Sequence, residues 1–114
     1  MRMFRKDEGF TLVELMVVVL IIGILVAIAI PVFNAATKTA RERTCHSNER
    51  TVEGAVEQYL AADPNYTVAG DDWTALMGKL VPDYIKAVPT CPEDGTYTFD
   101  DTAKTVSCSV HGHF

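Results

Sequence analysis

The distribution of hydrophobic residues divides the chain into two parts. From Phe10 to Phe33, 20 of 24 residues are hydrophobic, and no Asp, Glu, Lys or Arg occurs from Leu15 to Thr37. An apolar run longer than about 18 residues is long enough for a membrane-spanning helix. The pattern therefore predicts a long apolar helix near the N-terminus, followed by a smaller and more polar remainder.

The helical pattern continues beyond the apolar run, but it becomes amphipathic over residues 34–63. Apolar residues there follow the i, i+3, i+4, i+7, i+8 spacing that marks one buried stripe on a helix. The stripe consists of Val52, Ala55, Val56, Tyr59 and Leu60. Asp63-Pro64 should end this helix at about Ala62, because proline disfavours helix in the residue before it.

Three glutamates form an acidic row on the same predicted helix. Glu49, Glu53 and Glu57 are spaced four residues apart, so they share one face. Solvent exposure is one interpretation of this row. The other is that it faces basic groups of another subunit, such as Arg41 or Arg43.

The last part, residues 64–114 (the cap), combines a short helix with a hairpin. Asp71-Asp72 precede an apolar pattern that starts at Trp73, which is typical of an N-capped helix. Thr96–Phe99 and Thr105–Val110 are rich in β-formers and flank a turn-like segment, which predicts an antiparallel β-hairpin. The expected fold class is α+β, a long N-terminal helix carrying a small cap.

Charge and motif content limit the possible functions. The chain has 10 Lys and Arg against 15 Asp and Glu, a net charge of −5. An acidic balance disfavours a surface that follows nucleic-acid phosphates, although it leaves local DNA binding open. The sequence has no glycine-rich phosphate loop and no convincing nucleophile and histidine set, so we do not expect an enzyme.

Glu14 stands out because it is a carboxylate inside the apolar run. An unpaired acid in lipid costs a few kcal/mol, so a residue of this kind is a functional candidate. The side-chain cations of Arg5 and Lys6 lie outside the run. A free α-amino group, created by cleavage just before Phe10, would be a better placed partner.

The segment Gly9-Phe10-Thr11-Leu12-Val13-Glu14-Leu15, with the apolar run and Pro31 behind it, closely resembles the class III signal of type IV pilins and type II secretion pseudopilins. The resemblance implies a leader over residues 1–9, removed after Gly9 by a prepilin peptidase that also methylates the new amine of Phe10. It implies that Glu14 meets the N-terminal amine of a neighbouring subunit during assembly. It further implies an assembly helix over residues 10–33, which filament packing stretches near Pro31.

Pro31 itself leaves two interpretations open. Proline removes one backbone hydrogen bond and usually kinks or locally melts a helix. The alternative is that the helix ends at Ile30.

The resemblance also implies partners and a location. The subunit would wait in the cytoplasmic membrane with its N-terminus in the cytoplasm, which agrees with the positive charges of Arg2, Arg5 and Lys6. An assembly platform and its ATPase would then move it into a homo-oligomeric filament that is extracellular or spans the periplasm. Two alternatives to a type IV pilin stay open: a pseudopilin of a type II secretion or competence DNA-uptake system, and a single-pass membrane-anchored binding module.

The chain has three cysteines, Cys45, Cys91 and Cys108. A Cys91–Cys108 disulfide would resemble the C-terminal disulfide loop of many pilins, and it is the pairing we expect, with no cofactor. A competing interpretation is a metal site that uses all three cysteines. Cys91-Pro92-x-x-Gly95 and Cys108-x-x-His111-Gly112 look like two half-knuckles, and with Cys45 they give a Cys₃His set, the ligand types of a structural zinc site. Free thiols or a bridge between subunits are the third possibility.

Overall fold

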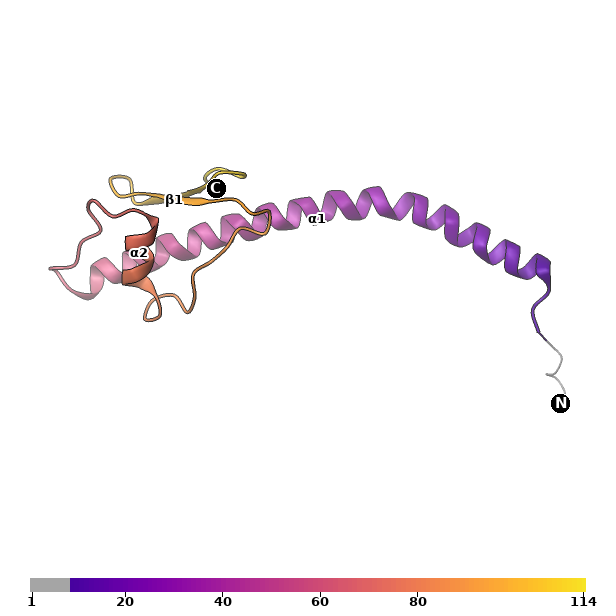
Figure 1. Ribbon diagram of the computed structural model, residues 1–114, viewed down its shortest axis with the longest axis horizontal. Coiled ribbons are helices and arrows are strands. Elements are labelled where there is room, and N and C mark those ends of the chain that lie inside the picture. The colour runs from indigo at the N-terminus through magenta and orange to yellow at the C-terminus, as the bar shows by residue number, and fades with distance from the viewer. Residues whose placement is uncertain (1–8) are drawn as a thin grey trace. The chain divides into compact units, whose positions relative to one another are not determined.

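The computed structural model describes residues 9–114, with the element order α1 (Leu12–Ala62), α2 (Trp73–Leu80), β1 (Tyr97–Asp100) and β2 (Thr105–Cys108) (Figure 1). This is the expected α+β fold. The chain divides into two compact units, one ending at Thr37 and the other, the second unit, running from Lys38 to Phe114. Apart from Gly9, the predicted leader over residues 1–9 lies outside the described residues.

In the first unit, the apolar segment forms the N-terminal part of α1. The Thr11 hydroxyl accepts a hydrogen bond from the backbone N–H of Glu14, at 3.1 Å, and so caps the first turn. The helix continues through Pro31, so the alternative that it ends at Ile30 is wrong. Among the described residues, α1 holds the one stretch that is long and apolar enough to cross a membrane, and none of that stretch is buried.

In the second unit, α1 presents the predicted stripe to the core. Val52, Ala55 and Val56 are buried, and Tyr59 and Leu60 pack against them while partly exposed. The helix ends at Ala62, as the Asp63-Pro64 pair predicts. The amphipathic interpretation is therefore confirmed.

Helix α2 lies in the cap and begins where its sequence indicates. The Asp72 carboxylate accepts a hydrogen bond from the backbone N–H of Ala75 at 2.8 Å, which caps the helix. Its buried face consists of Leu76, Met77 and Leu80. Trp73 is partly buried, and its ring centroid lies 5.1 Å from that of Tyr97. Helix α2 thus packs its apolar side into the hydrophobic core of the second unit.

Strands β1 and β2 pair antiparallel, with Tyr97 opposite Cys108 and Asp100 opposite Thr105. The Asp100 carboxylate accepts hydrogen bonds from the backbone N–H groups of Thr102 and Ala103, which fixes the turn between the strands. Strand β2 ends at Cys108, two residues earlier than predicted, because the chain turns back there and Gly112 bridges to Cys108.

The acidic row does not behave as one solvated face. Glu49 is fully buried, and its carboxylate accepts the backbone N–H of Phe114 at 3.1 Å. The carboxylate of Glu53 accepts the backbone N–H of Val106 at 2.8 Å. Only Glu57 is exposed. Neither interpretation of the row holds for the first two glutamates, because both bind backbone N–H groups of the cap within the same chain.

Leu76 provides a test of this core. It is fully buried, so Leu76→Ala should lower the free energy of unfolding by about 2–5 kcal/mol through lost burial and the cavity left behind. Urea denaturation can be followed by the fluorescence of Trp73, the chain's single tryptophan. The same substitution at Leu20, which is 62% exposed, is the control and should leave the transition unchanged. Equal effects of the two substitutions would contradict the assigned core.

Candidate functional site

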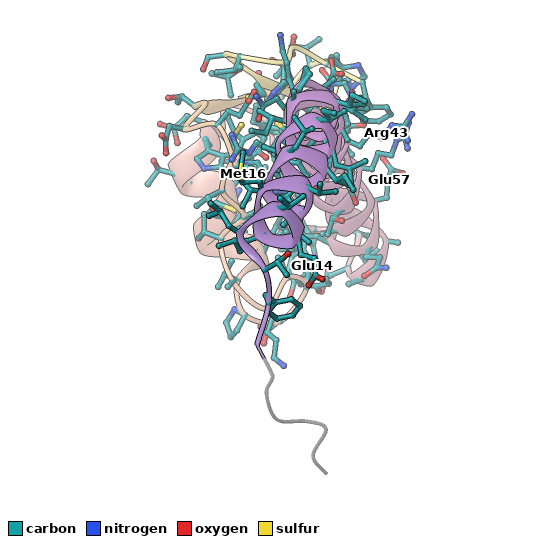
Figure 2. All side chains as sticks on the ribbon, turned by 90° about the vertical axis from the view of Figure 1, so that its right-hand side faces the viewer. Glu14, Met16, Arg43 and Glu57 are labelled. Atoms are coloured by element: carbon teal, nitrogen blue, oxygen red, sulfur yellow. The ribbon has the colours of Figure 1, made fainter. Side chains whose placement is uncertain are left out.

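Two sets of residues are candidates for function, and each lies within one unit. The first is the apolar segment from Phe10 to Phe33, whose large side chains are all exposed in the single chain. Glu14 lies among them, next to Val13 and Leu15, which are 67% and 55% exposed (Figure 2). A helix so apolar on every side needs other molecules around it, either lipid or neighbouring helices.

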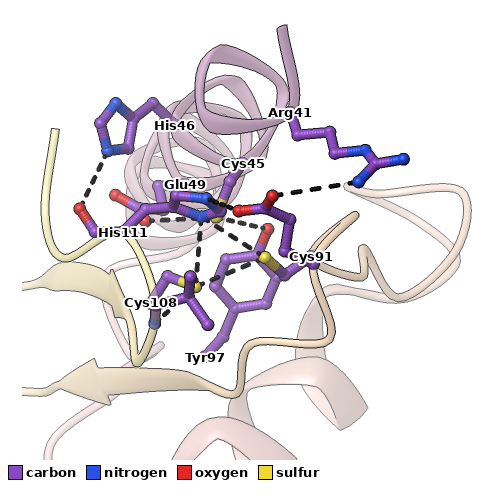
Figure 3. A network of polar contacts seen from close by, with 10 residues as sticks. Arg41, Cys45, His46, Glu49, Cys91, Tyr97, Cys108 and His111 are labelled. Carbon is purple, nitrogen blue, oxygen red and sulfur yellow. Dashed lines mark hydrogen bonds and ion pairs between the residues drawn. The ribbon is translucent and has the colours of Figure 1, made fainter. Parts of the chain in front are cut away.

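The second set, which we call the cysteine-histidine cluster, lies where α1, the turn before β1 and the turn after β2 meet (Figure 3). Its four potential ligand atoms, three sulfurs and one imidazole nitrogen, all lie within 4.8 Å of one another. The members are Cys45, Cys91, Cys108 and His111. All three cysteines are buried.

The individual distances in this cluster are short. The Sγ atoms of Cys91 and Cys108 lie 3.6 Å apart. The Nδ1 atom of His111 lies 3.5 Å from the sulfur of Cys91 and 3.8 Å from that of Cys108. The three cysteines are thiols in the structure. The Cys91–Cys108 disulfide therefore stays a prediction, as does the competing zinc site.

Two turns bring the cluster together. After Cys91, the backbone N–H of Asp94 donates to the Cys91 carbonyl at 3.1 Å, and after Cys108, the N–H of Gly112 donates to the Cys108 carbonyl at 2.8 Å. The second turn needs a glycine, because Gly112 has φ of +70°.

Gly95 lies against the sulfurs. A Cβ atom at this position would be only 2.4 Å from the Cys108 sulfur and 3.1 Å from the Cys91 sulfur. The backbone can therefore pass this close to the cluster only because residue 95 has no side chain.

The surroundings orient the imidazole and the sulfurs. His111 Nε2 lies 2.7 Å from a carboxylate oxygen of Glu93, and the His111 side chain is only 7% exposed. The Tyr97 hydroxyl donates to the Cys45 sulfur at 3.4 Å, and the backbone N–H of Val110 donates to the Cys108 sulfur at 3.4 Å. The Glu93 carboxylate thus favours the tautomer with its proton on Nε2, which leaves Nδ1 facing the sulfurs.

The same environment changes the pKa of the Cys45 thiol and that of the Cys108 thiol in opposite directions. Burial raises the pKa of the Cys45 thiol to about 12. Burial acts in the same direction on Cys108, but hydrogen bonds from the backbone N–H groups of Val110 and His111 lower the pKa of that thiol below its ordinary value. Desolvation favours a neutral His111, yet its contact with Glu93 raises the pKa of the imidazole. Without a bound cation, Cys108 is therefore a better thiolate than Cys45.

Sequence reasoning missed the residues around the cluster. Glu93 and Tyr97 contact the His111 imidazole and the Cys45 sulfur, and no spacing rule indicated these contacts. Glu49 lies four residues after Cys45 on α1, so helical spacing does place its carboxylate beside the Cys45 thiol, at 3.8 Å. For Glu93, the available signal was its position two residues after Cys91, on the same turn.

Comparison with known proteins concerns chiefly the first set of residues, the apolar segment from Phe10 to Phe33. Residues 4–30 match the family model described as the prokaryotic N-terminal methylation motif. The type IV narrow pilus major component PilA5 of Thermus thermophilus is 34% identical, over 92% of this chain and 81% of that protein. The chain belongs to the type IV pilin and pseudopilin family.

Other members of this pilin and pseudopilin family match over similar lengths. The type IV wide pilus major component PilA4 of Thermus thermophilus is 28% identical, over 96% of this chain and 76% of that protein. The type II secretion system core protein G of Aeromonas hydrophila is 29% identical, over 82% of this chain and 72% of that protein. No solved structure gives a significant match.

Proposed function

We propose that this chain is a structural subunit of a type IV pilus-like filament, cleaved after Gly9, methylated at Phe10 and polymerised through its N-terminal helix. The observation that carries the proposal is the first unit, an apolar helix with Glu14 near its start and no buried residue, in a chain of the pilin family. A role in assembly accounts for both the exposed apolar surface and the acid within it.

Before assembly, lipid would cover the exposed apolar side chains. In the filament, the same side chains would contact the helices of neighbouring subunits. Both environments are apolar, so the subunit can be stored in the membrane and then transferred to the fibre core with little loss of apolar burial. The cap stays outside the membrane in both states.

The proposed processing can be tested at Gly9. In a host with an active prepilin peptidase, the wild-type chain should have the intact mass of residues 10–114 plus one methyl group. A Gly9→Val chain should keep residues 1–9, because a branched side chain obstructs the peptide bond that is cut, and it should form no fibres. Mass spectrometry of membrane fractions and electron microscopy of sheared fibres provide the two measurements.

Thr11→Ser is the matched control for processing. It retains the hydroxyl that accepts the Glu14 N–H, so cleavage and fibre formation should stay as in the wild type. A wild-type chain that keeps its first nine residues in such a host would contradict the proposal and favour a membrane-anchored binding module.

A pseudopilin is the second candidate, favoured by the match to the type II secretion core protein G. The two candidates differ in the fibres they make. Abundant surface fibres at native expression would support the pilus. Short fibres, or fibres seen only on overexpression, would support the pseudopilus, especially if the gene lies beside those of secretion components.

A further inference from the structure

We propose that the cysteine-histidine cluster binds one Zn²⁺ ion, and that this ion joins the cap to α1. The inference concerns the second unit only and is independent of the assembly role of the N-terminal helix. It rests on four observations, which are the ligand types, their spacing, the donors around them and the glycine against the sulfurs (Figure 3).

The spacing of the cluster fits a tetrahedral ion. Two thiolates at ~2.3 Å from one tetrahedral zinc lie ~3.8 Å apart, and a thiolate and an imidazole nitrogen at ~2.1 Å lie ~3.6 Å apart. The Cys91 and Cys108 sulfurs are separated by 3.6 Å. The His111 Nδ1 atom lies 3.5 and 3.8 Å from these sulfurs, and the Cys45 sulfur is within 4.8 Å of all three atoms. Little movement is needed to place four ligands around one ion.

The contacts around the ligands are those that a metal site requires. A zinc-bound imidazole usually donates its other N–H to a carboxylate, which fixes the ring and raises its basicity. Glu93 occupies this place, 2.7 Å from Nε2. The sulfurs of Cys45 and Cys108 each accept a hydrogen bond, from Tyr97 and from the Val110 backbone, and such donors stabilise thiolates.

Zinc binding changes the charge of the cluster. Binding releases one proton from each thiol, and three thiolates with one neutral imidazole bring the ion to a net charge of −1. Before binding, the Cys45 thiol points to the Glu49 carboxylate at 3.8 Å, and once its proton is released the charge of the ion compensates the Cys45 thiolate. Zinc has no redox chemistry and prefers Cys₃His sets of this kind for structural sites.

The position of the cluster indicates what the ion would do. Its ligands come from three segments, which are α1 at Cys45, the turn before β1 at Cys91, and the end of β2 with the following turn at Cys108 and His111. One ion therefore closes two long loops at once. A small cap with few buried residues gains much from such a constraint.

The test uses the full chain, purified in detergent without chelator. We expect one zinc per chain by elemental mass spectrometry, and three alkylatable thiols after denaturation. A chain that is two hydrogens lighter and free of zinc has a disulfide between two of the three cysteines, which overturns the proposal, and peptide mapping would show whether it joins Cys91 to Cys108. Iron or copper at one per chain overturns the assignment to zinc. Three free thiols that bind no added zinc in competition with a chelating dye overturn it as well.

Variants separate ligands from neighbours. Cys108→Ser and His111→Ala should weaken zinc binding at least ~100-fold, and Glu93→Gln, which removes the carboxylate beside His111 Nε2 and its ion pair with Arg41 at 4.0 Å, should weaken it ~10–100-fold. The control is His113→Ala, because His113 pairs with Glu53 at 2.9 Å, outside the cluster, and its loss should leave zinc affinity unchanged. Equal affinities for all four variants and the wild type would contradict the ligand assignment.

Two measurements on the wild type keep the proposal testable if the ligand variants do not fold. Cobalt in place of zinc should give sulfur-to-cobalt charge-transfer absorption and the intense d–d bands of a tetrahedral site. Removing zinc with a chelator should lower the melting temperature by more than ~15 °C, since a tightly bound ion stabilises the folded state by mass action. Octahedral cobalt bands, or an unchanged melting temperature, would overturn the proposal.

Discussion

A Gly95→Ala chain should unfold more easily than the wild type, by about 1–3 kcal/mol, because the added methyl group has no space. Its Cβ atom would lie 2.4 Å from the Cys108 sulfur, 3.1 Å from the Cys91 sulfur and 3.1 Å from a methyl group of Val110. Real Cβ contacts are essentially never shorter than 3.0 Å, so the sulfur or the backbone must move. If an ion fixes the sulfurs, they cannot move without strain on their bonds to it, and zinc affinity should fall as well.

Gly78→Ala is the matched control in the same unit. Gly78 lies in α2, and a Cβ atom there has nothing within 4 Å, so alanine should stabilise the helix by about 0.5–1 kcal/mol. Urea denaturation followed by Trp73 fluorescence measures both variants. Similar unfolding midpoints for the two variants would contradict the proposed close approach at Gly95.

A second substitution, at Cys108, tests whether its sulfur causes the destabilisation by Gly95→Ala. In a Cys108→Ala background the nearest sulfur is absent, so the additional cost of Gly95→Ala should fall well below its cost in the wild type. The difference between the cost of Gly95→Ala in the wild type and its cost in the Cys108→Ala background is the interaction energy of the two positions. For residues in contact, this energy is typically about 0.5–3 kcal/mol. Additive effects would show that the Cys108 sulfur is not responsible and would assign the destabilisation to the Cys91 sulfur, the Val110 methyl group or the backbone.

The helices of this protein were predictable because their signals are local. The Asp63-Pro64 pair ends α1 at Ala62, and Asp72 caps α2, and both effects involve residues within a few positions of one another. The buried stripe at Val52, Ala55 and Val56 follows from helical periodicity alone. The same is true of the apolar run and of the acid inside it.

The contacts across the second unit were not predictable in this way. The i, i+4 spacing of Glu49 and Glu53 indicates that they share a face, but it does not indicate what covers that face. The structure places backbone N–H groups of Phe114 and Val106 there, 65 and 53 residues away in the sequence. Carboxylates that bind buried N–H groups look the same in sequence as carboxylates in water.

The cysteine-histidine cluster was predictable from the sequence only in part. The chain spacing suggested Cys108 and His111 as one half-knuckle and Cys91 with Gly95 as another. Whether Cys45 reaches them depends on the packing of the hairpin against α1, which is a tertiary property. The role of Glu93 also depends on this packing, because its carboxylate meets an imidazole 18 residues further along the chain.

The second large effect is expected at Glu14. This residue lies in the first turns of α1, between Val13 and Leu15, and is exposed in the single chain (Figure 2). In the proposed filament its carboxylate pairs with the N-terminal amine of Phe10 in a neighbouring subunit. Opposite charges attract strongly in an apolar environment, and removal of one partner leaves the other charge buried and uncompensated.

Glu14→Ala should therefore insert into the membrane and be processed normally, but it should not assemble. Loss of one partner of a buried ion pair costs about 3–5 kcal/mol, which is more than ~100-fold in the association of a subunit. The measurement is the amount of chain in sheared fibres relative to the amount of processed chain in membranes. Normal fibres from this variant would contradict the proposed pairing.

Three further variants show whether charge is the reason. Glu14→Asp keeps the carboxylate and should retain part of the assembly, whereas Glu14→Gln keeps the shape without the charge and should resemble Glu14→Ala. Val13→Ala shortens a neighbouring exposed side chain, 67% accessible, without a change of charge, and should impair assembly far less than Glu14→Ala. If Glu14→Gln assembles as well as the wild type, a hydrogen bond rather than an ion pair aligns the subunits.

Co-expression gives the sharpest form of this test, because the pairing is not symmetric. A Glu14→Ala subunit lacks the carboxylate but still carries its own N-terminal amine, which can meet the intact Glu14 of a wild-type neighbour. Such subunits should therefore enter mixed filaments while forming none alone. As their share of the pool rises, the amount of fibre should fall steeply and their share of the fibre should lag behind their share of the pool, since two adjacent variant subunits have no pair between them. A helix that was merely misfolded by the substitution would be excluded from mixed filaments too, which separates a defect of register from a defect of folding.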